Sequence, residues 1–425
     1  MSKETLSSYD VLNRFFDEGS FTETDAYLKS ASGDAEAVTG FGTVDERPVF
    51  AFAQNVDACG GAMSKAQAKK ITKLFNAALK VGAPIVGFYD SVGGRLEQKY
   101  ELLSAYGDIL RKSAKLSGVV PQISVVLGSC VGTSALIAAS ADHIIMEKDA
   151  KLSIDTSGKA SLAEDNQKNG VASFVCEGKD AAIDKAKTLL GYFPANNLDY
   201  TAFESAPAYE NPDRLPKVIA DADSLICAGA GYGDDVCTAF GRVDGNPVGF
   251  VVTQGGDISA AAAKKVAKHV RFCDAFSLPI ITLVDAKNFE SIGDASALVS
   301  AYADATTAKI SVIKGTAVGA VYIALAGATS GADAVYALPE AIISPVAPKA
   351  AAFLLDPSIA DAPFEEQDKL IDSYIKANLT AVKAAEDGYI DDIAEGAELR
   401  DKIIAALNML ASKRVSTLPK KHSTK

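Results

Sequence analysis

Short apolar runs alternate with amphipathic segments along the chain, and this order predicts parallel strands joined by helices. Residues 123–127 form an apolar run rich in β-branched side chains, too short for a helix and typical of a buried parallel strand. A glycine-containing turn at 128–132 ends the run. Residues 133–140 are rich in Ala and Leu, which predicts a helix, and residues 142–146 return to extended structure. Such a unit presents backbone N–H groups at a helix N-terminus, where negative charge is stabilised.

The same order of elements occurs twice. Each copy has a hairpin, a helix, a strand that ends in Asp, a second helix, and the strand–glycine turn–helix unit. The hairpin, first helix, strand and final unit lie at 40–55, 66–81, 83–90 and 121–145 in the first copy, and at 239–254, 261–276, 278–285 and 309–338 in the second. The second helix contains residues 105–106 in the first copy and 301–302 in the second. A spacing such as 195 residues between Asp90 and Asp285 (285 − 90) indicates duplicated domains rather than a solenoid. Alternating strands and helices predict parallel sheets that are covered on both faces.

The pattern also sets expected domain limits. Residues 1–37 are polar with one apolar stripe and predict a helical N-terminal arm. We expect a first domain over 38–215 and a second over 216–412, followed by a basic, disordered tail at 413–425.

Composition narrows the classes of function. A net charge of −12 and a pI near 4.9 argue against a nucleic-acid-binding surface. The N-terminal residues lack the apolar segment of a signal peptide, and no apolar run reaches the ~18 residues of a membrane span, so direct membrane insertion is not expected. The six cysteines form no CxxC pair, which predicts reduced thiols in a cytoplasmic protein and no metal site.

Several segments together resemble a known family. They are RFFDEGSF (14–21), DSVGGR (90–95), SGVVPQISVVLGSCVG (117–132), NGVASFVCEG (169–178), FPANN (193–197) and HVRFCDAFSLPIITLVD (269–285). The chain thereby resembles the carboxyltransferase subunits of biotin-dependent acyl-CoA carboxylases and decarboxylases. This resemblance implies an α/β fold of two tandem crotonase-like (ClpP/crotonase) ββα-superhelix domains.

The resemblance also implies two oxyanion holes built from backbone N–H groups. One stabilises the enolate of the acyl-CoA thioester and maps onto Gly132 and Thr133. The other stabilises the ureido enolate of biotin and maps onto Gly319 and Ala320. Preorganised N–H donors of this kind typically contribute ~3–4 kcal/mol each to the transition state.

Further residues are candidates for binding the substrate. Gly93 and Gly94 let a thioester approach the backbone of the first domain, and Arg95 is placed either to reach a CoA phosphate or to form an ordinary ion pair. Tyr322 follows the second oxyanion pair. It either fills the space beside the acyl group, which favours short acyl chains, or points into the core of its own domain.

The family resemblance implies partners as well. The chain has no lysine between two methionines, the pattern of the family's biotin carrier, so biotin must arrive on a biotin carboxyl carrier protein. A biotin carboxylase or membrane decarboxylase subunits complete such complexes. The family also implies a homo-oligomer, at least a dimer and most often a hexamer, because the site forms between the first domain of one subunit and the second domain of another.

Other interpretations remain open. The loop after Asp285 is shorter than in the family, which favours a catalytically degenerate scaffold or regulatory subunit, whereas the retained Gly319 and Ala320 favour an enzyme. A crotonase-type hydrolase or isomerase is a third class, weakened by the second domain. A nucleophilic Cys130 competes with a buried structural thiol, and His269 is either a base or a structural histidine. Asp90 and Asp285 either orient the following loop or cap helices.

Overall fold

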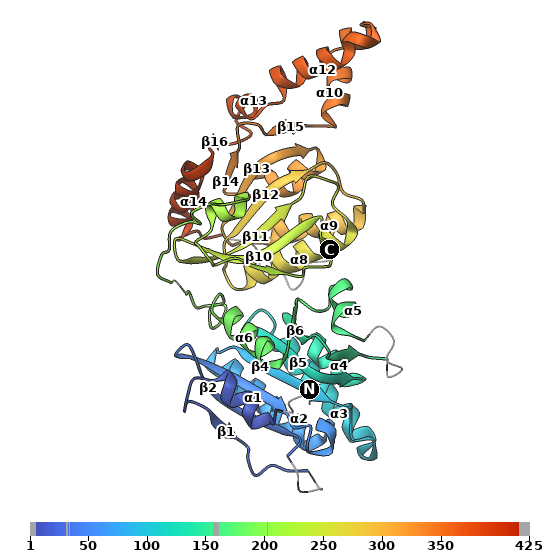
Figure 1. Ribbon diagram of the computed structural model, residues 1–425, viewed down its shortest axis with the longest axis vertical. Helices are drawn as coiled ribbons and strands as arrows, with labels where there is room; N and C mark the ends of the chain where they lie inside the picture. The colour runs from blue at the N-terminus through green and yellow to red at the C-terminus, as the bar shows by residue number, and fades with distance from the viewer. Residues whose placement is uncertain (1–5, 31–32, 34, 156–160, 202, 416–425) are drawn as a thin grey trace. The chain divides into compact units, whose positions relative to one another are not determined.

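The computed structural model describes residues 6–30, 33, 35–155, 161–201 and 203–415. The chain divides into two compact units, Met1–Thr201 and Ala202–Lys425, coloured from blue to green and from green to red in Figure 1. The division precedes residue 215, because residues from 203 onward pair with the second unit: the Phe203 N–H donates to the Gly245 carbonyl at 3.0 Å. Residues 416–425 of the predicted tail lie outside the described part.

Each unit contains an eight-stranded sheet, and the two sheets share one strand order. The order is β1-β2-β3-β4-β5-β6-β8 with β7 paired to β5, and β9-β10-β11-β12-β13-β14-β16 with β15 paired to β13. The first three strands of each sheet pair antiparallel and the remaining pairs are parallel. The bounds are β1 Thr22–Thr24, β2 Ala37–Val44, β3 Arg47–Gln54, β4 Ile85–Ser91, β5 Gln122–Val131, β6 His143–Glu147, β7 Lys151–Ser153, β8 Phe174–Cys176, β9 Ile226–Ala228, β10 Val236–Val243, β11 Asn246–Thr253, β12 Ile280–Ala286, β13 Lys309–Val318, β14 Ala334–Ala337, β15 Ile342–Ser344 and β16 Asp392–Ile393.

The helices follow the predicted pattern, with capping residues at several ends. Ser64 accepts the Gln67 N–H to begin α2, and Gly82 ends it in a left-handed conformation. In the second copy Ser259 begins α8 in the same way. The bounds are α1 Ser8–Phe15, α2 Lys65–Val81, α3 Tyr100–Leu116, α4 Thr133–Ala139, α5 Ala163–Lys168, α6 Lys179–Leu190, α7 Leu215–Ile219, α8 Ala260–Ala275, α9 Ile292–Asp304, α10 Pro348–Leu355, α11 Ser358–Asp361, α12 Phe364–Asn378, α13 Ala381–Glu386 and α14 Gly396–Leu410.

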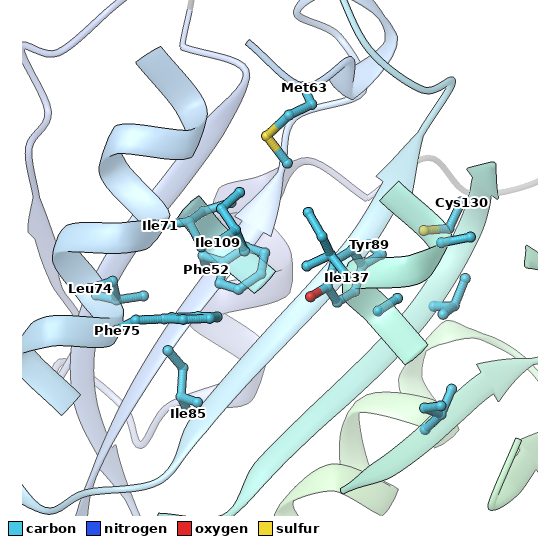
Figure 2. Close-up of a cluster of buried hydrophobic side chains, with 14 of the residues drawn as sticks. Phe52, Met63, Ile71, Leu74, Phe75, Ile85, Tyr89, Ile109, Cys130 and Ile137 are labelled. Carbon is cyan, nitrogen blue, oxygen red and sulfur yellow. The ribbon is translucent and has the colours of Figure 1, made fainter. Parts of the chain in front are cut away.

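The first sheet buries side chains on both faces. Phe52 and Tyr89 contact each other edge to face, 5.4 Å between ring centroids, in the cluster that α2 and α3 cover. Figure 2 shows this cluster, which also includes Ile71 and Cys130. Phe88, one residue before Tyr89, points to the opposite face and contacts Phe15 of α1, with 5.1 Å between the ring centroids. Successive strand residues therefore fill two different layers, as expected for a buried strand.

Both hairpins are held by an aspartate from outside the turn. Asp17 accepts the N–H groups of Asp45 and Glu46 at 3.1 and 3.0 Å, and both of these turn residues have positive φ. Asp221 accepts the corresponding N–H groups of the second hairpin, Asp244 and Gly245, at 2.8 Å each. Asp17 and Asp221 both precede the segments in which the sequence repeat is recognisable, so the duplicated structure begins earlier in the chain than the repeat.

Two expectations about local structure were wrong. Within the described residues of the N-terminal arm, helix is confined to α1, and residues 22–24 form β1 because they pair with β2. The segment 128–131, expected as a turn, continues β5 to Val131, because β7 pairs with residues 129–131. The second copy behaves alike, since β13 runs to Val318 and pairs with β15.

Candidate functional site

The first candidate turn lies between β5 and α4. Gly132 adopts φ 69° and ψ −144°, a conformation that glycine reaches without strain. Its N–H donates to the Ser153 carbonyl of β7 at 2.9 Å. Thr133 is the first residue of α4, so its N–H has no acceptor within the helix and points out of its N-terminus. The outward-pointing donor of this turn is therefore Thr133, while Gly132 bends the chain.

The second candidate turn has the same construction. Gly319 has φ 47° and donates its N–H to the Ser344 carbonyl of β15 at 2.8 Å. A Cβ at Gly319 would lie 2.8 Å from the Pro345 carbonyl oxygen, so only glycine fits. Ala320 follows at the start of the helical segment that becomes a π-helical turn at Tyr322–Ala326. Ala320 thus occupies the position of Thr133.

A second backbone strip lies beside the first turn. Met63 pairs with Gly94 through the Met63 N–H to the Gly93 carbonyl at 2.8 Å, and the Arg95 N–H to the Met63 carbonyl at 2.9 Å. This bridge leaves the Gly94 N–H facing away from Met63. The Ser134 hydroxyl of α4 lies 3.4 Å from the Gly93 carbonyl, so the strip and the helix N-terminus are neighbours.

The second unit repeats this strip. Ile258 pairs with Phe289 through the same two bonds, from the Ile258 N–H to the Asn288 carbonyl at 2.9 Å and from the Glu290 N–H to the Ile258 carbonyl at 3.0 Å. Phe289 therefore corresponds to Gly94. Sequence reasoning did not select Phe289, although its spacing of 195 residues from Gly94 (289 − 94) equals that between Asp90 and Asp285.

The strand-end aspartates fasten the neighbouring strand. Asp90 accepts the Ser129 N–H at 3.1 Å, and Asp285 accepts the Thr316 N–H at 2.9 Å. In both sheets the pairing shifts register at this point, between Tyr89 and Ser91 in the first. The residues before these two N–H donors are glycines, Gly128 and Gly315, and a Cβ added to either would lie 2.3–2.4 Å from the nearest carboxyl atom of the aspartate. Each aspartate thus orients the strand that leads to its turn and caps no helix.

The Asp90 carboxyl group is partly buried beside Lys179. Burial raises the pKa of its carboxyl group, opposed by Lys179, whose Nζ lies 3.8 Å from Oδ2, and by the Ser129 N–H. A cavity of about 680 Å³ borders this contact and includes Gly128 and Lys151 in its wall.

Arg95 and Tyr322 both have partners inside their own units. Arg95 donates to Glu36 at 3.0 Å and pairs with Glu97, and Glu36 is only 1% exposed. The Tyr322 hydroxyl donates to the Tyr389 carbonyl at 2.7 Å. Its ring lies against Gly327, where a Cβ would come within 2.9 Å. These contacts orient both side chains before any ligand is present.

The thiol and imidazole candidates are structural. Cys130 is fully buried, and burial raises the pKa of its thiol, so it is not a nucleophile at neutral pH. His143 is stacked on Phe193 at 5.5 Å. His269 is buried against Phe240, and burial, followed by the charge of Lys265, lowers its pKa to about 4. Among the described residues, no cluster of three potential metal ligands occurs. No helix there is long and apolar enough to cross a lipid bilayer.

Comparisons with known proteins agree on one family. The family model described as "Carboxyl transferase domain" matches residues 4–424. Among curated relatives, methylmalonyl-CoA decarboxylase subunit alpha of Veillonella parvula is 33% identical over 98% of this chain and 92% of its own length. The methylmalonyl-CoA carboxyltransferase 12S subunit of Propionibacterium freudenreichii subsp. shermanii is 34% identical over 99% and 91%.

The fold is similar to a solved structure of the same kind. The transcarboxylase 12S crystal structure, a hexamer assembly with hydrolysed methylmalonyl-coenzyme A bound, superposes with a TM-score of 0.93 at 32% identity. The match covers 99% of this chain and 92% of that chain. The expected tandem crotonase-like fold is thereby confirmed.

Proposed function

The chain belongs to the carboxyl transferase domain family, and from that premise we propose that it moves CO2 between carboxybiotin and a short-chain acyl-CoA. It is a biotin-dependent acyl-CoA carboxyltransferase, the subunit of a carboxylase or decarboxylase. Biotin, covalently held on a separate carrier protein, supplies or receives the CO2. The relatives name methylmalonyl-CoA and propionyl-CoA, so these are the acyl esters to test first.

The duplicated backbone turn is the observation that carries this proposal. Carboxyl transfer develops negative charge on two carbonyl oxygens, one on the thioester and one on the ureido group of biotin. Each unit offers an N–H at a helix N-terminus, from Thr133 or Ala320, beside a strip whose N–H comes from Gly94 or Phe289. Preorganised N–H donors stabilise such charge without reorganisation during the reaction.

We base the assignment of acyl-CoA and biotin to the two units on the residues around each turn. In the first unit the space beside Gly93 is open, whereas an added Cβ at Gly94 would lie 2.7 Å from Leu102 and 2.8 Å from the Tyr106 hydroxyl. Gly93 therefore leaves room at the backbone for a thioester, Gly94 packs closely on α3, and Gly132 and Thr133 form the adjoining turn. In the second unit, the proposed place for the bicyclic ring of biotin is beside the turn at Gly319 and Ala320. We assign the acyl-CoA to the first unit and biotin to the second.

The degenerate scaffold is not supported. Its basis was the short loop after Asp285, yet that loop retains the Ile258–Phe289 bridge and the Asp285 contact to Thr316. The second turn also keeps a glycine where a Cβ would collide with Pro345. These contacts support an intact backbone at the proposed biotin-side site.

Assembly and location complete the proposal. The crystal structure of the 12S relative is a hexamer, and we expect a hexamer, or at least a dimer, with a biotin carboxyl carrier protein and either a biotin carboxylase or membrane decarboxylase subunits as partners. Exposed apolar residues on the C-terminal helices, including Leu354, Leu355 and Phe364, offer surface for such contacts.

We place the protein in the cytoplasm, without nucleic acid as a partner.

Decarboxylation with free biotin tests the activity. The purified chain is mixed with biotin and, separately, malonyl-, methylmalonyl- or glutaconyl-CoA, and release of CO2 is measured. We expect biotin-dependent loss of CO2 from methylmalonyl-CoA or malonyl-CoA, faster than from glutaconyl-CoA. Hydrolysis of the thioester without CO2 release would instead support a crotonase-type hydrolase, and no reaction with any ester would support the scaffold.

A further inference from the structure

Two cysteines of the second unit lie together at the edge of its sheet, away from both candidate turns in the sequence and the strand order. Cys227 lies on β9, the edge strand, and Cys237 lies on the adjacent strand β10. Their Sγ atoms are 3.6 Å apart. In the antiparallel register Cys227 is opposite Ala239, so Cys237 is its diagonal neighbour on the same face of the sheet. The fold thus brings into contact two thiols that lie ten residues apart in the sequence (237 − 227).

The two thiols have different surroundings. Cys227 is exposed, whereas Cys237 is partly buried. A hydrogen bond from Cys237 lowers the pKa of the Cys227 thiol, burial opposes this, and the positive charges of Arg214 and Lys265 lower it further. The same contact and burial raise the pKa of Cys237. The first proton to leave the pair therefore leaves a thiolate on the exposed sulfur, where a reagent can reach it.

Lys265 of α8 reaches the end of the edge strand β9. It is 9% exposed and its Nζ donates to the Gly229 carbonyl at 3.3 Å, one residue beyond β9. Burial lowers the pKa of the Lys265 ammonium, while nearby Asp234 and the two cysteines act to raise it. A cation next to an exposed thiol is the environment in which cysteines become reactive.

We propose that Cys227 and Cys237 form a redox-reactive dithiol site that takes low-molecular-weight disulfides as its substrates. Cys227 is the attacking thiol and Cys237 the resolving thiol. The site is independent of the carboxyltransferase activity, so this proposal stands or falls separately from it.

The reaction has two balanced steps. The Cys227 thiolate attacks one sulfur of the small disulfide, whose S–S bond breaks. One thiolate leaves and takes up a proton, and Cys227 holds the other half as a mixed disulfide. Cys237 then loses its proton and attacks Cys227 Sγ, which breaks the mixed disulfide and releases the second small thiol. Two protein thiols are oxidised to one disulfide, and one small disulfide is reduced to two thiols.

Oxidised glutathione is the probe for the test. The full-length protein is incubated with it at neutral pH, free thiols are blocked with iodoacetamide, and digested peptides are identified by mass spectrometry. We expect a Cys227–Cys237 cross-link in the wild-type protein. The variant Cys237→Ser should instead accumulate glutathione on Cys227, and Cys227→Ser should leave Cys237 unmodified.

Cys59 provides an internal comparison, because its thiol is also exposed and lies in the first unit, where it accepts a hydrogen bond from Arg95 at 3.0 Å rather than from a second thiol. We expect iodoacetamide to alkylate Cys227 at least tenfold faster than Cys59 at pH 7. The Cys59→Ser variant is the matched control and should form the cross-link at the wild-type rate. The proposal is overturned if the wild-type protein shows no cross-link, or if glutathione accumulates on Cys227 equally with and without Cys237.

Discussion

Among single residues, the glycines that begin the two turns act through their backbone conformation. Gly132 and Gly319 both have positive φ, and both N–H groups donate to a neighbouring strand rather than toward the space beside the turn. The assignment of these glycines as bending residues, with Thr133 and Ala320 as donors, separates two roles that the sequence does not distinguish.

Replacing Gly132 with Val tests the first turn. An added Cβ meets no atom within 4 Å, so the cost is backbone strain at φ 69°, on the order of 1–3 kcal/mol. We expect turnover of acyl-CoA esters to fall by at least a hundredfold while the circular dichroism spectrum is retained. Gly178→Val is the control, because Gly178 also has positive φ and open space, yet immediately precedes α6. Equal loss of turnover in both variants would show general destabilisation rather than a role at the turn.

The side chain of Tyr322 is expected to control which acyl chain the enzyme accepts. If its ring borders the acyl pocket, Tyr322→Ala should raise kcat/KM for five-carbon relative to three-carbon acyl-CoA by about tenfold, since a methylene in a pocket changes specificity by ~1–3 kcal/mol. Tyr322→Phe loses only the hydroxyl bond to the Tyr389 carbonyl and keeps the ring. It should therefore leave the ratio unchanged. An unchanged ratio in Tyr322→Ala would assign the side chain to packing within its own unit.

Among the elements, the strand before each turn pairs with its neighbour through a register shift and is held by an aspartate. Asp90 lies three residues before Gly93, and it accepts the N–H of Ser129, which lies three residues before Gly132. Asp90 therefore joins the strip to the turn. The same construction around Asp285 shows that the device belongs to the duplicated fold.

Asp90→Ala and Asp90→Asn test whether the aspartate positions the turn. Loss of the acceptor in Asp90→Ala leaves the Ser129 N–H unpaired, which costs ~1–3 kcal/mol, and we expect kcat to fall about tenfold with little change in KM. Asn retains an oxygen for the Ser129 N–H and should restore kcat. Because burial raises the pKa of Asp90, the neutral Asn should not reduce stability at pH 7. Wild-type kcat in Asp90→Ala would remove the positioning role.

The limits of prediction from sequence are clearest for these elements. Expected helices at 66–81 and 261–276 correspond to Lys65–Val81 and Ala260–Ala275, because apolar spacing and serine caps are local signals. The end of β5 was missed because its last residues pair with β7, only three residues long and without any periodic pattern. For the same reason the sequence could indicate the turn at Gly132 but not the acceptor that Ser153 provides for its N–H.

For the molecule as a whole, stability should depend on pH through His269. Its pKa in the folded protein is about 4, against 6.5 as the ordinary value, because burial disfavours the imidazolium. Between pH 6.5 and 4 the unfolded chain binds a proton that the folded chain does not, so stability falls as pH decreases through this window. The loss should approach about 3 kcal/mol near pH 4.

Urea unfolding of wild type and His269→Gln at pH 7, 5.5 and 4.5 measures this contribution. The variant has its own, pH-independent cost for a buried amide, so the comparison concerns the slope with pH. We expect the difference in unfolding free energy between the two proteins to shrink as pH falls. A constant difference would show that His269 does not titrate on unfolding.

Assembly is also a property of the whole molecule. Helices α10, α11 and α12 pack on one another around Ile359 and Ile371, yet leave Leu354 and Phe364 largely exposed. We expect light scattering of the active protein to give a hexamer, and Phe364→Asp to shift it toward smaller species. A wild-type protein that is active as a monomer would contradict the proposed assembly.

The position of α14 has a consequence for the order in which the protein is made. Arg400 of α14 bonds to Asp221 at 2.8 Å and to the Ala206 carbonyl at 3.0 Å, and Leu399 and Ile403 fill the core of the second unit. The described strands and helices of the first unit end at Leu190, so this unit can fold while the ribosome is still elongating the chain. The second unit must wait until α14, at Gly396–Leu410, has been translated, because that helix holds its earliest segments. A nascent chain arrested before α14 would therefore carry one finished unit and one with an open core, and the second unit is where a chaperone would be needed during synthesis.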